Sequence, residues 1–381
     1  MINNLEHFCL FGLLYLISFS LLLYKPERIQ AKFWGCVWLF VAAYSIIVGC
    51  RYGWGHDYLS YKDFYNHVYF EEGRDYGYYL LNYVENALGI PFEGHILFCA
   101  FFYIISSYYL VKKSGVANAW MLVLFMPVTL LFSTYAIRHF LAISFLYLFI
   151  GYYLFDEHNR RGVMQIATAV LLIGIAYSIH AASILFVLPF FIFIFYRDVK
   201  ALNYIIVIIT YIIVIVFTRQ FSEYLNDWIG ENIQMISLDN HFQSYIDQSD
   251  KWFGEDAENE ETFGYGGIYQ LFSYLSNIAI LYLSGRTLSV QNNKNVSIIY
   301  NVFAIAIIIR EIFFEQEIMR RIIDPYVIMA YVPLGYGIYN AMRFERKFIY
   351  ILVLAFALLG IYYPQYKFLI NFSLADFMWN H

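Results

Sequence analysis

Charged side chains are scarce in this sequence. They make up 14% of its 381 residues, whereas hydrophobic side chains make up 61%. A soluble domain carries about 25% charged residues. A chain this long and this apolar cannot hide its hydrophobic surface in a water-facing fold, but a bilayer can take that surface up. The composition therefore predicts an all-α, polytopic integral membrane protein, and the small net charge of −5 gives no indication of nucleic-acid binding.

Motifs that hold metals, nucleotides or disulfides are also missing. The four cysteines have no metal-ligand spacing and lie in or next to apolar runs, so they are expected to be small buried residues: Cys9, Cys36, Cys50 and Cys99. There is no HExxH, no paired acid motif and no cluster of histidines. A Gly-rich phosphate loop and a nucleotide fingerprint are absent as well. We therefore expect no metal and no cofactor.

Apolar runs long enough to cross a bilayer recur along the whole chain. A span needs about 20 mostly apolar residues, and about 12 such helices can be placed. They are expected near 8–24, 33–50, 95–111, 117–135, 138–155, 163–179, 181–196, 201–217, 267–284, 296–314, 322–340 and 348–363. The first run follows a segment without Lys or Arg and lacks a cleavage site, so it is interpreted as a retained span. The breaks near 133–139 and 179–183 are so short that each indicates a tight hairpin or a broken helix.

Positive charge alternates between successive connections, which predicts the orientation. With the N-terminus outside, every cytoplasmic connection carries at least two basic residues, and together they hold 14 basic and 5 acidic residues, a net charge of +9. The outer side then holds 10 basic and 24 acidic residues, a net charge of −14. The inner basic residues are Lys25, Arg28, Lys32, Lys112, Lys113, Arg160, Arg161, Arg197, Lys200, Arg286, Lys294, Arg343, Arg346 and Lys347.

Both long loops lie on the predicted outer side of a single transmembrane domain over 1–381. The loop 51–94 is rich in aromatic residues and glycine, and its segment 78–88 is expected to form a short helix in the membrane interface. The loop 218–266 contains the acidic run 255–261, which is interpreted as a solvated tip.

Several outer arginines oppose the positive-inside trend. Arg51, Arg138, Arg310, Arg320 and Arg321 come from distant parts of the chain and are expected at a similar depth. Arginine binds phosphate through two parallel hydrogen bonds and keeps its charge, so these residues could converge on an anion. Pairing with nearby acids, or extension toward lipid headgroups, is the alternative.

The densest polar and aromatic cluster is the segment 51–65. Asp57 could cap a helix over 58–68. Alternatively, Asp57 or His56 is a base or a sugar-hydroxyl acceptor, and Tyr58 and Tyr61 stack on a carbohydrate.

His180 stands alone between two apolar runs. A lone histidine is often a satisfied core residue, but its ordinary pKa also suits a proton acceptor. The predicted topology places it outside, near the depth of Arg138.

Five distinctive segments follow one another along the chain. They are the Arg-x-Gly-x-Gly-x-Asp-Tyr-x-x-Tyr pattern at 51–61, YGYYLLNYVENALGI at 76–90, YAIRHFLAISFLYLFIGYYL at 135–154, HAASIL with the following Leu-Pro at 180–189, and RRIIDPYVIMAYVPLGYGI at 320–338. In this order they resemble the EpsG family of polysaccharide polymerases, which belongs to the wider Wzy-type group. In the second segment the family has an acidic or small residue and Gly-Tyr before an amphipathic helix. His56 departs from the family, where a threonine or a similar residue is expected.

The resemblance implies a GT-C-like helical bundle in the bacterial cytoplasmic membrane, with its active site on the extracytoplasmic side. It implies a metal-independent, inverting glycosyltransferase that joins polyprenyl-diphosphate-linked oligosaccharides into a surface polysaccharide such as an O-antigen, capsule or exopolysaccharide. A chain-length regulator and a flippase are the expected partners besides the lipid bilayer.

Residue roles follow from the resemblance together with the outer arginines. The expected catalytic residues are His180, Asp57 and Arg138, and the expected substrate-binding residues are Arg51, Tyr58, Tyr61, Arg310, Arg320, Arg321 and Tyr326. An O-antigen ligase, another lipid-linked glycosyltransferase, or a flippase or transporter of the same glycan are the alternatives. The helix centres carry little charge, which argues against a polar transport path.

Overall fold

The computed structural model describes most of the chain. The described residues are 2–23, 30–53, 58–67, 75–116, 118–155, 162–194, 199–217, 268–313, 317–341, 347–371 and 376–377. Asp57, His56 and the predicted loop 218–266 lie outside these ranges.

Helices account for nearly all of the described structure, so the predicted all-α class is confirmed. The helices are α1 Ile2–Ser20, η1 Leu21–Leu23, α2 Gln30–Gly49, α3 Tyr58–His67, α4 Tyr76–Ala87, α5 Phe92–Lys113, α6 Ala119–Tyr135, α7 Ile137–Phe149, the π-helical turn η2 Ile150–Leu154, α8 Val163–Ile179, η3 Ala181–Ser183, α9 Ile184–Ile194, a helix over 204–217, α13 Ile268–Val290, α14 Lys294–Ile312, α15 Glu317–Val327, η6 Ile328–Ala330, α16 Tyr331–Ala341 and α17 Lys347–Asn371. Strands β1, Arg51–Tyr52, and β2, Asp376–Phe377, pair antiparallel.

The predicted apolar runs coincide with these helices, but their ends differ. Helix α13 continues to Val290, beyond the predicted end at residue 284. The predicted helix 322–340 begins earlier, at Glu317, and is interrupted by the 3₁₀ turn η6. Within the described ranges, three segments are long and apolar enough to cross a membrane, namely Phe92–Lys113, Ile137–Leu154 and Lys294–Ile312. Shorter apolar helices occupy the other runs, and the number of spans stays a prediction.

Both short breaks foreseen in the sequence are single-residue interruptions. Ala136 separates α6 from α7 with φ −112° and ψ 69°. His180 separates α8 from η3 and α9 with φ −156° and ψ 105°. Neither dihedral pair is helical. The helical backbone is therefore broken at Ala136 and at His180 without a loop between the helices.

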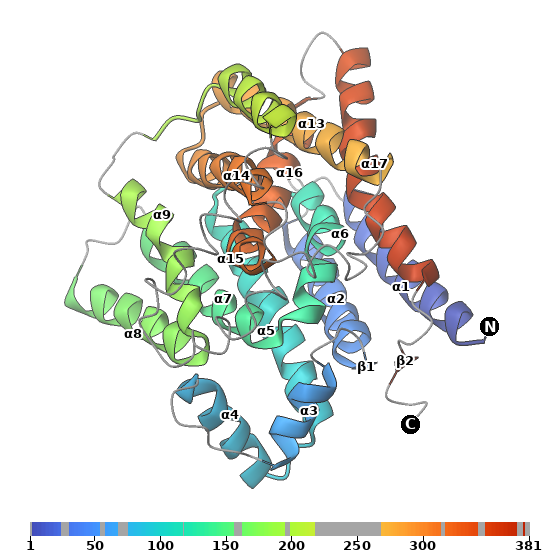
Figure 1. Ribbon diagram of the computed structural model, residues 1–381, viewed down its shortest axis with the longest axis vertical. Coiled ribbons are helices and arrows are strands. Elements are labelled where there is room, and N and C mark those ends of the chain that lie inside the picture. Colours follow the sequence, from blue (N-terminus) through green and yellow to red (C-terminus); the bar gives the residue numbers. More distant parts are fainter. Residues whose placement is uncertain are drawn as a thin grey trace.

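The helices are arranged around a central group. Helices α5, α6, α7 and α15 lie in the middle, α1 and α17 form one flank, and α8 and α9 form the opposite flank (Figure 1). The short helices α3 and α4 lie together at one end of the molecule. Their ranges confirm the predicted helices at 58–68 and 78–88 within two residues.

Aromatic ring contacts connect the central helices. The ring of Tyr103 on α5 lies 5.6 Å from Phe125 on α6 and 6.2 Å from Tyr147 on α7. Phe125 in turn meets Tyr331 edge-on, at 5.4 Å. Offset and edge-to-face pairs add about 0.5–1.5 kcal/mol each beyond their buried area. The high aromatic content thus joins the central helices, where the bilayer provides no hydrophobic drive between helices.

Small residues bring the outer helices into close contact. A Cβ built on Gly360 of α17 would lie 2.2 Å from Cβ of Ser276 on α13, so only glycine fits there. Ser276 donates a hydrogen bond across this contact to the carbonyl of Ala357, at 3.0 Å. Close approach through small residues and an interhelical hydroxyl bond is typical of packing between membrane helices.

The perimeter helices expose large apolar side chains. Leu16 on α1, Met164 on α8, Ile206 on the helix 204–217 and Ile351 on α17 are between 57% and 77% exposed. Such a distribution is costly in water and is what a lipid-facing surface requires. Together with the apolar runs, it indicates a membrane protein.

The prediction that all four cysteines are buried is wrong. All four are free thiols, but only Cys99 is buried, whereas Cys9 is exposed on α1, and Cys36 and Cys50 are partly exposed. Cys9 and Cys36 belong to α1 and α2, where one face of the helix is left uncovered by neighbouring helices, so apolar sequence context did not ensure burial.

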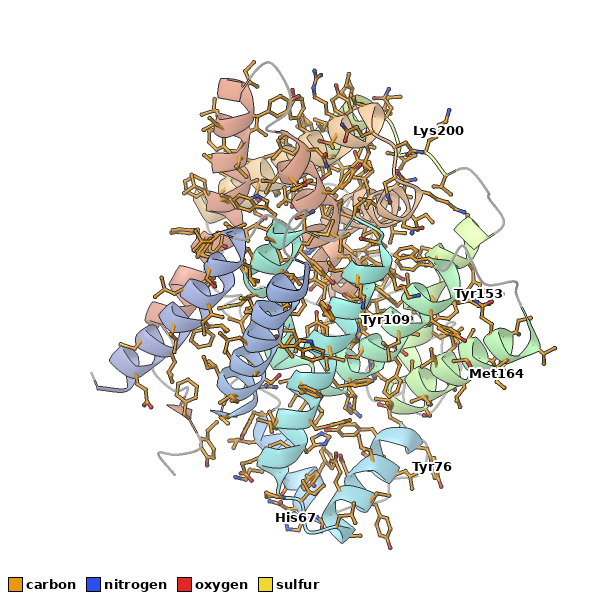
Figure 2. The ribbon with its side chains drawn as sticks, turned by 180° about the vertical axis from the view of Figure 1, so that it is seen from behind. His67, Tyr76, Tyr109, Tyr153, Met164 and Lys200 are labelled. Atoms are coloured by element: carbon orange, nitrogen blue, oxygen red, sulfur yellow. The ribbon has the colours of Figure 1, made fainter. Side chains whose placement is uncertain are left out.

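Two residues that are predicted on opposite sides of the membrane lie far apart in the molecule. Figure 2 shows His67 and Tyr76 at one end and Lys200 at the opposite end. His67 belongs to the predicted outer loop and Lys200 to a predicted cytoplasmic connection.

This arrangement predicts a labelling pattern. In a background without native cysteines, His67→Cys should react with a membrane-impermeant maleimide in intact cells, because residue 67 is exposed. The equally exposed Lys200→Cys should react only after the membrane is permeabilised. Labelling of Lys200→Cys in intact cells would reverse the orientation.

Candidate functional site

A carboxylate, a guanidinium and an imidazole from three distant segments meet at the two helix breaks. Asp75, directly before α4, accepts a hydrogen bond from Nη1 of Arg138 at 2.9 Å. The same oxygen lies 3.3 Å from Nδ1 of His180, and the other oxygen accepts from the backbone N–H of Ala181 at 3.1 Å. Asp75 therefore binds the break after α8 and the first turn of α7 at once.

A glycine allows α4 to reach this position. A Cβ on Gly77 would lie 2.2 Å from Oγ of Ser178 and 2.9 Å from the backbone carbon of Ser178. The first turn of α4 can therefore lie directly against the end of α8, which carries His180 two residues later. Without this contact, Asp75 could not accept the N–H of Ala181, which is the first N–H of η3.

Arg138 lies between the carboxylate and two tyrosine rings. Its guanidinium carbon is 5.5 Å from the ring centre of Tyr61 and 5.8 Å from that of Tyr78, within the range of cation–π contacts. Arg138 is the second residue of α7, where the positive end of the helix dipole disfavours a cation. The aspartate and the rings offset that cost.

Two nitrogens at this place are buried without a hydrogen-bond partner. They are Nε of Arg138 and Nε2 of His139. The ring of His139 lies 4.9 Å from that of His180, and Arg321 acts electrostatically on His139. Buried polar atoms are rarely left unsatisfied, so an orphaned donor here suggests a polar ligand.

The environment keeps Asp75 ionised. Burial alone would raise its pKa, but the hydrogen bond with His180 and the charge of Arg138 outweigh burial and hold the pKa below its usual value. An ionised Asp75 accepts a proton-bearing Nδ1, which leaves Nε2 of His180 as the atom able to accept a proton. That tautomer is assigned from the hydrogen bonds.

The predicted arginines do not all converge. Arg310 pairs with Asp324 at 2.8 Å, which links α14 to α15. Arg320 is close enough to the buried Glu311 to act on it electrostatically. These two arginines interact with acids of α14 and α15, whereas Arg321, also on α15, acts electrostatically on His139.

Two expected binding residues are buried, each with one polar atom that has no hydrogen-bond partner, Nε of Arg51 and the hydroxyl of Tyr58. Arg51 is 2% exposed, and its Nη1 donates to the carbonyl of Val48 at 2.7 Å. Tyr58 is 1% exposed and packs edge-on against Phe92 at 5.3 Å, and burial raises the pKa of its hydroxyl. Neither side chain reaches Arg138 through these contacts.

Tyr326 joins two helices. Its hydroxyl donates to the carbonyl of Leu185, and its ring stacks on Phe186 of α9 at 4.9 Å. This contact holds α15 beside α9.

Sequence reasoning missed Asp75, Tyr78 and His139. Asp75 is 63 positions from Arg138 and 105 from His180, so no local pattern connects them. The available signals were its position directly before an amphipathic helix and the adjacency of His139 to Arg138.

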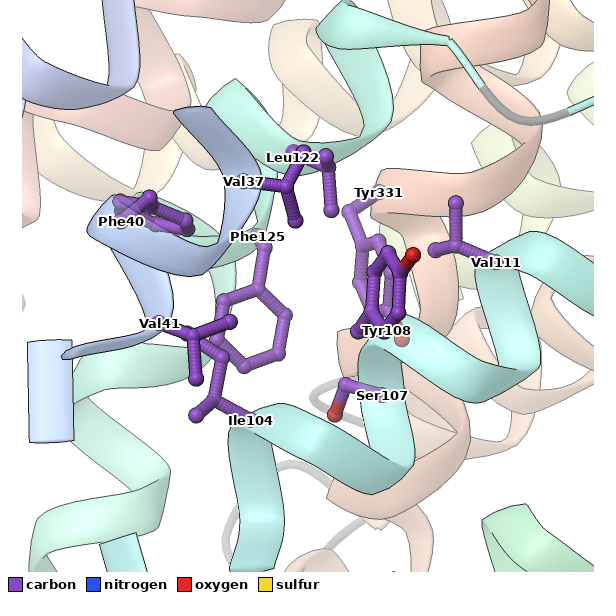
Figure 3. Close-up of a pocket in the computed structure, with 10 residues that line it drawn as sticks. All are labelled: Val37, Phe40, Val41, Ile104, Ser107, Tyr108, Val111, Leu122, Phe125 and Tyr331. Atoms are coloured by element: carbon purple, nitrogen blue, oxygen red, sulfur yellow. The ribbon is translucent and has the colours of Figure 1, made fainter. Parts of the chain in front are cut away.

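The small pocket in Figure 3 lies elsewhere. It is formed by α2, α5, α6 and the start of α16, and most of its lining is aliphatic or aromatic, including Val37, Ile104 and Phe125. None of Asp75, Arg138, His139 and His180 lines it. The pocket has few polar side chains, so the candidate site is the group of ionic contacts made by Asp75 with Arg138 and His180. In the described ranges, no group of three or more His, Cys, Asp or Glu side chains could hold a metal ion.

Comparison with known proteins identifies the family. The EpsG family model matches residues 32–374. The chain belongs to the EpsG family. The match spans Asp75, Arg138 and His180, most of α2 and every described helix from α3 to α17. No curated protein and no solved structure matches the chain. EpsG family membership indicates a polysaccharide polymerase-like function in a membrane protein.

The ionic contacts of Asp75 predict a pH-dependent stability. A depressed pKa means that Asp75 stabilises the fold above its unfolded value of about 3.8 and loses that contribution as pH falls through the folded value. Asp75→Asn should therefore lower the thermal midpoint at pH 7, and the difference from the wild type should shrink only below about pH 4. Thermal unfolding in detergent at several pH values measures this.

Asp63→Asn is the matched control. Asp63 is on α3 with its side chain 66% exposed, so its replacement should change the midpoint little at any pH. Convergence of the Asp75→Asn and wild-type midpoints already at pH 6 would contradict an ionised, paired Asp75.

Proposed function

We propose that this EpsG family protein polymerises polyprenyl-diphosphate-linked oligosaccharide repeat units into a surface polysaccharide at the outer face of the bacterial cytoplasmic membrane. The observation that carries the proposal is the bridge from Asp75 to Arg138 and His180. It places a fixed cation beside a histidine whose second nitrogen is available. A leaving diphosphate requires the first group, and an attacking hydroxyl requires the second.

The proposed reaction is a single displacement. A hydroxyl oxygen of the acceptor unit attacks the anomeric carbon of the growing glycan and forms the new glycosidic bond. The bond from that carbon to the diphosphate oxygen breaks, and the polyprenyl diphosphate leaves with the electron pair. The hydroxyl proton passes to Nε2 of His180. One displacement inverts the anomeric centre, and the step uses no metal.

The charges around Arg138 support the proposal that the leaving diphosphate binds there. Arg138 and Arg321 supply two positive charges near His139, and Asp75 supplies one negative charge. The cluster therefore carries a net positive charge before substrate binds. The orphaned Nε of Arg138 is a donor that a phosphate oxygen would satisfy. The dipole at the start of α7 acts in the same direction.

Tyr61 and the lipid environment suit the rest of the substrate. A tyrosine ring can stack on a sugar face, and Tyr61 lies beside Arg138. The polyprenyl chain would remain in the bilayer beside the apolar helices. A chain-length regulator and a flippase are proposed partners in the same pathway. Arg310, Arg320 and Tyr326 would then support the site through α15 rather than touch the diphosphate.

A reconstitution experiment tests the activity. Lipid-linked oligosaccharides are extracted from membranes of a strain that lacks this protein and are supplied to purified protein in liposomes. A ladder of lengthened glycans on the carrier lipid is expected. Transfer to a different acceptor would indicate a ligase, and translocation without any new glycosidic bond would indicate a flippase. Either outcome would overturn the polymerase proposal.

Replacement of the guanidinium tests the diphosphate contact. Arg138→Lys should lower the rate of ladder formation by about 10²-fold or more, because an ammonium does not reproduce two directed hydrogen bonds to phosphate. Arg286→Lys is the matched control, since Arg286 pairs with Tyr350 on a predicted cytoplasmic connection. A wild-type rate for Arg138→Lys or Arg138→Ala would remove Arg138 from the mechanism.

A further inference from the structure

A second carboxylate–histidine pair lies next to the candidate site and takes no part in the mechanism above. Oε2 of Glu85, on α4, is 2.6 Å from Nδ1 of His95, on α5. The other ring nitrogen of His95 is 3.1 Å from the hydroxyl of Tyr78, on α4. We call Glu85, His95 and Tyr78 the α4–α5 polar chain.

The α4–α5 polar chain is removed from solvent. His95 is 0%, Tyr78 2% and Glu85 7% exposed. Polar groups at this depth are costly unless each has a partner, and both ring nitrogens of His95 have one. A carboxylate can only accept, so Nδ1 of His95 donates to Glu85, and Nε2 is left to share a hydrogen bond with the hydroxyl of Tyr78. The imidazole therefore links the carboxylate on α4 to the tyrosine on the same helix.

The ring of Tyr78 connects this chain to the site. It lies 5.8 Å from the guanidinium carbon of Arg138 and meets the ring of Tyr61 edge-on at 6.1 Å. Tyr61 also lies under the same guanidinium. The hydroxyl of Tyr78 is held by His95, so its ring has little freedom to turn away from Arg138.

Ring contacts fix His95 in turn. Its ring lies 5.4 Å from that of Tyr65 and 6.1 Å from that of Phe92, with which it stacks. The hydroxyl of Tyr65 donates to the carbonyl of Ile90 at 2.8 Å, so the turn between α4 and α5 is tied to the same group. A change at His95 would therefore be transmitted through Tyr78 rather than absorbed locally.

We propose that Glu85, His95 and Tyr78 are positioning residues that hold the guanidinium of Arg138 in the orientation needed for the leaving diphosphate. The inference rests on the proposed polymerase function and adds a new role to it. The three residues touch neither substrate nor reacting atoms. Asp75 fixes one edge of the guanidinium, and the Tyr78 ring, anchored through His95 and Glu85, fixes its plane.

The test is a double-mutant cycle in the liposome assay, with the lipid-linked oligosaccharides extracted as above. Tyr78→Phe keeps the ring but removes the link to His95, and it should lower kcat about tenfold with KM changed less than about twofold. In an Arg138→Lys background the same change should cost less than about twofold, because the group that it positions is already altered. Tyr83→Phe, on the exposed face of α4, should leave the rate unchanged.

A conservative rescue provides a second measurement. Glu85→Gln keeps an oxygen that accepts from Nδ1 of His95 and should stay within about threefold of the wild-type kcat. Glu85→Leu leaves that donor buried and unsatisfied, and it should lower kcat about tenfold. If Tyr78→Phe fails to fold, as judged by size-exclusion chromatography, the Glu85 pair still tests the proposal.

The outcomes separate the two proposals. No ladder from the wild-type protein would contradict the polymerase function. If the wild-type protein forms a ladder but the rate losses of Tyr78→Phe and Arg138→Lys multiply in the double mutant, the positioning role alone is contradicted. It is also contradicted if Tyr78→Phe changes only KM. Equal losses for Glu85→Gln and Glu85→Leu would also contradict it, because a conservative acceptor would then provide no rescue.

Discussion

The ionic contact between Asp75 and Arg138 is the constraint on which the rest of this structure depends. Arg138 stands in the first turn of an apolar helix, where both the surrounding hydrocarbon side chains and the helix dipole oppose a positive charge. A carboxylate from outside α7 offsets both costs, and Asp75 is that carboxylate, at 2.9 Å. A charge at this depth without a partner would be expelled or neutralised, so Arg138 and Asp75 have to be explained together.

The position of α4 follows from that contact. Asp75 can reach Arg138 only if the first turn of α4 lies against α8, and the glycine at 77 permits this approach to Ser178. Asp75 then also binds the N–H of Ala181, so the beginning of η3 is capped by a residue 106 positions away. The break at His180 therefore needs no loop of its own, and His180 is held with Nδ1 toward the carboxylate. Asp75 therefore contributes to helix packing, to the capping of η3 and to the geometry of the site.

The sequence predicted the helices well because apolar length and charge alternation are local properties. The runs that became α5, α7 and α14 could be recognised from composition alone, whereas α3 and α4 were indicated by a possible cap at Asp57 and by the alternation of apolar and polar residues at 78–88. The site was predicted only in part. Arg138 and His180 were conspicuous because each interrupts an apolar run, whereas Asp75 was one acid among 24 on the predicted outer side. Its role depends on contacts across 63 and 105 positions, which no spacing rule contains. Arg51 and Tyr58 stood in the most distinctive motif but are buried, because a motif shows which residues occur together and not which way they face.

A residue that serves both fold and site makes ordinary loss-of-function data ambiguous. Removing Asp75 would free Arg138, uncap η3 and release His180 together, so inactivity alone could not separate misfolding from lost chemistry. The substitutions that do separate them keep the shape and change one property. Asn at 75 keeps the size and the ability to accept hydrogen bonds but loses the charge, and Lys at 138 keeps the charge but loses the planar fork. Because the first change removes the negative charge that pairs with Arg138, whereas the second keeps an ion pair and removes only the fork, stability and rate should respond differently to these two changes. That difference is the physical evidence that would distinguish a site built on this contact from a contact that only holds helices together.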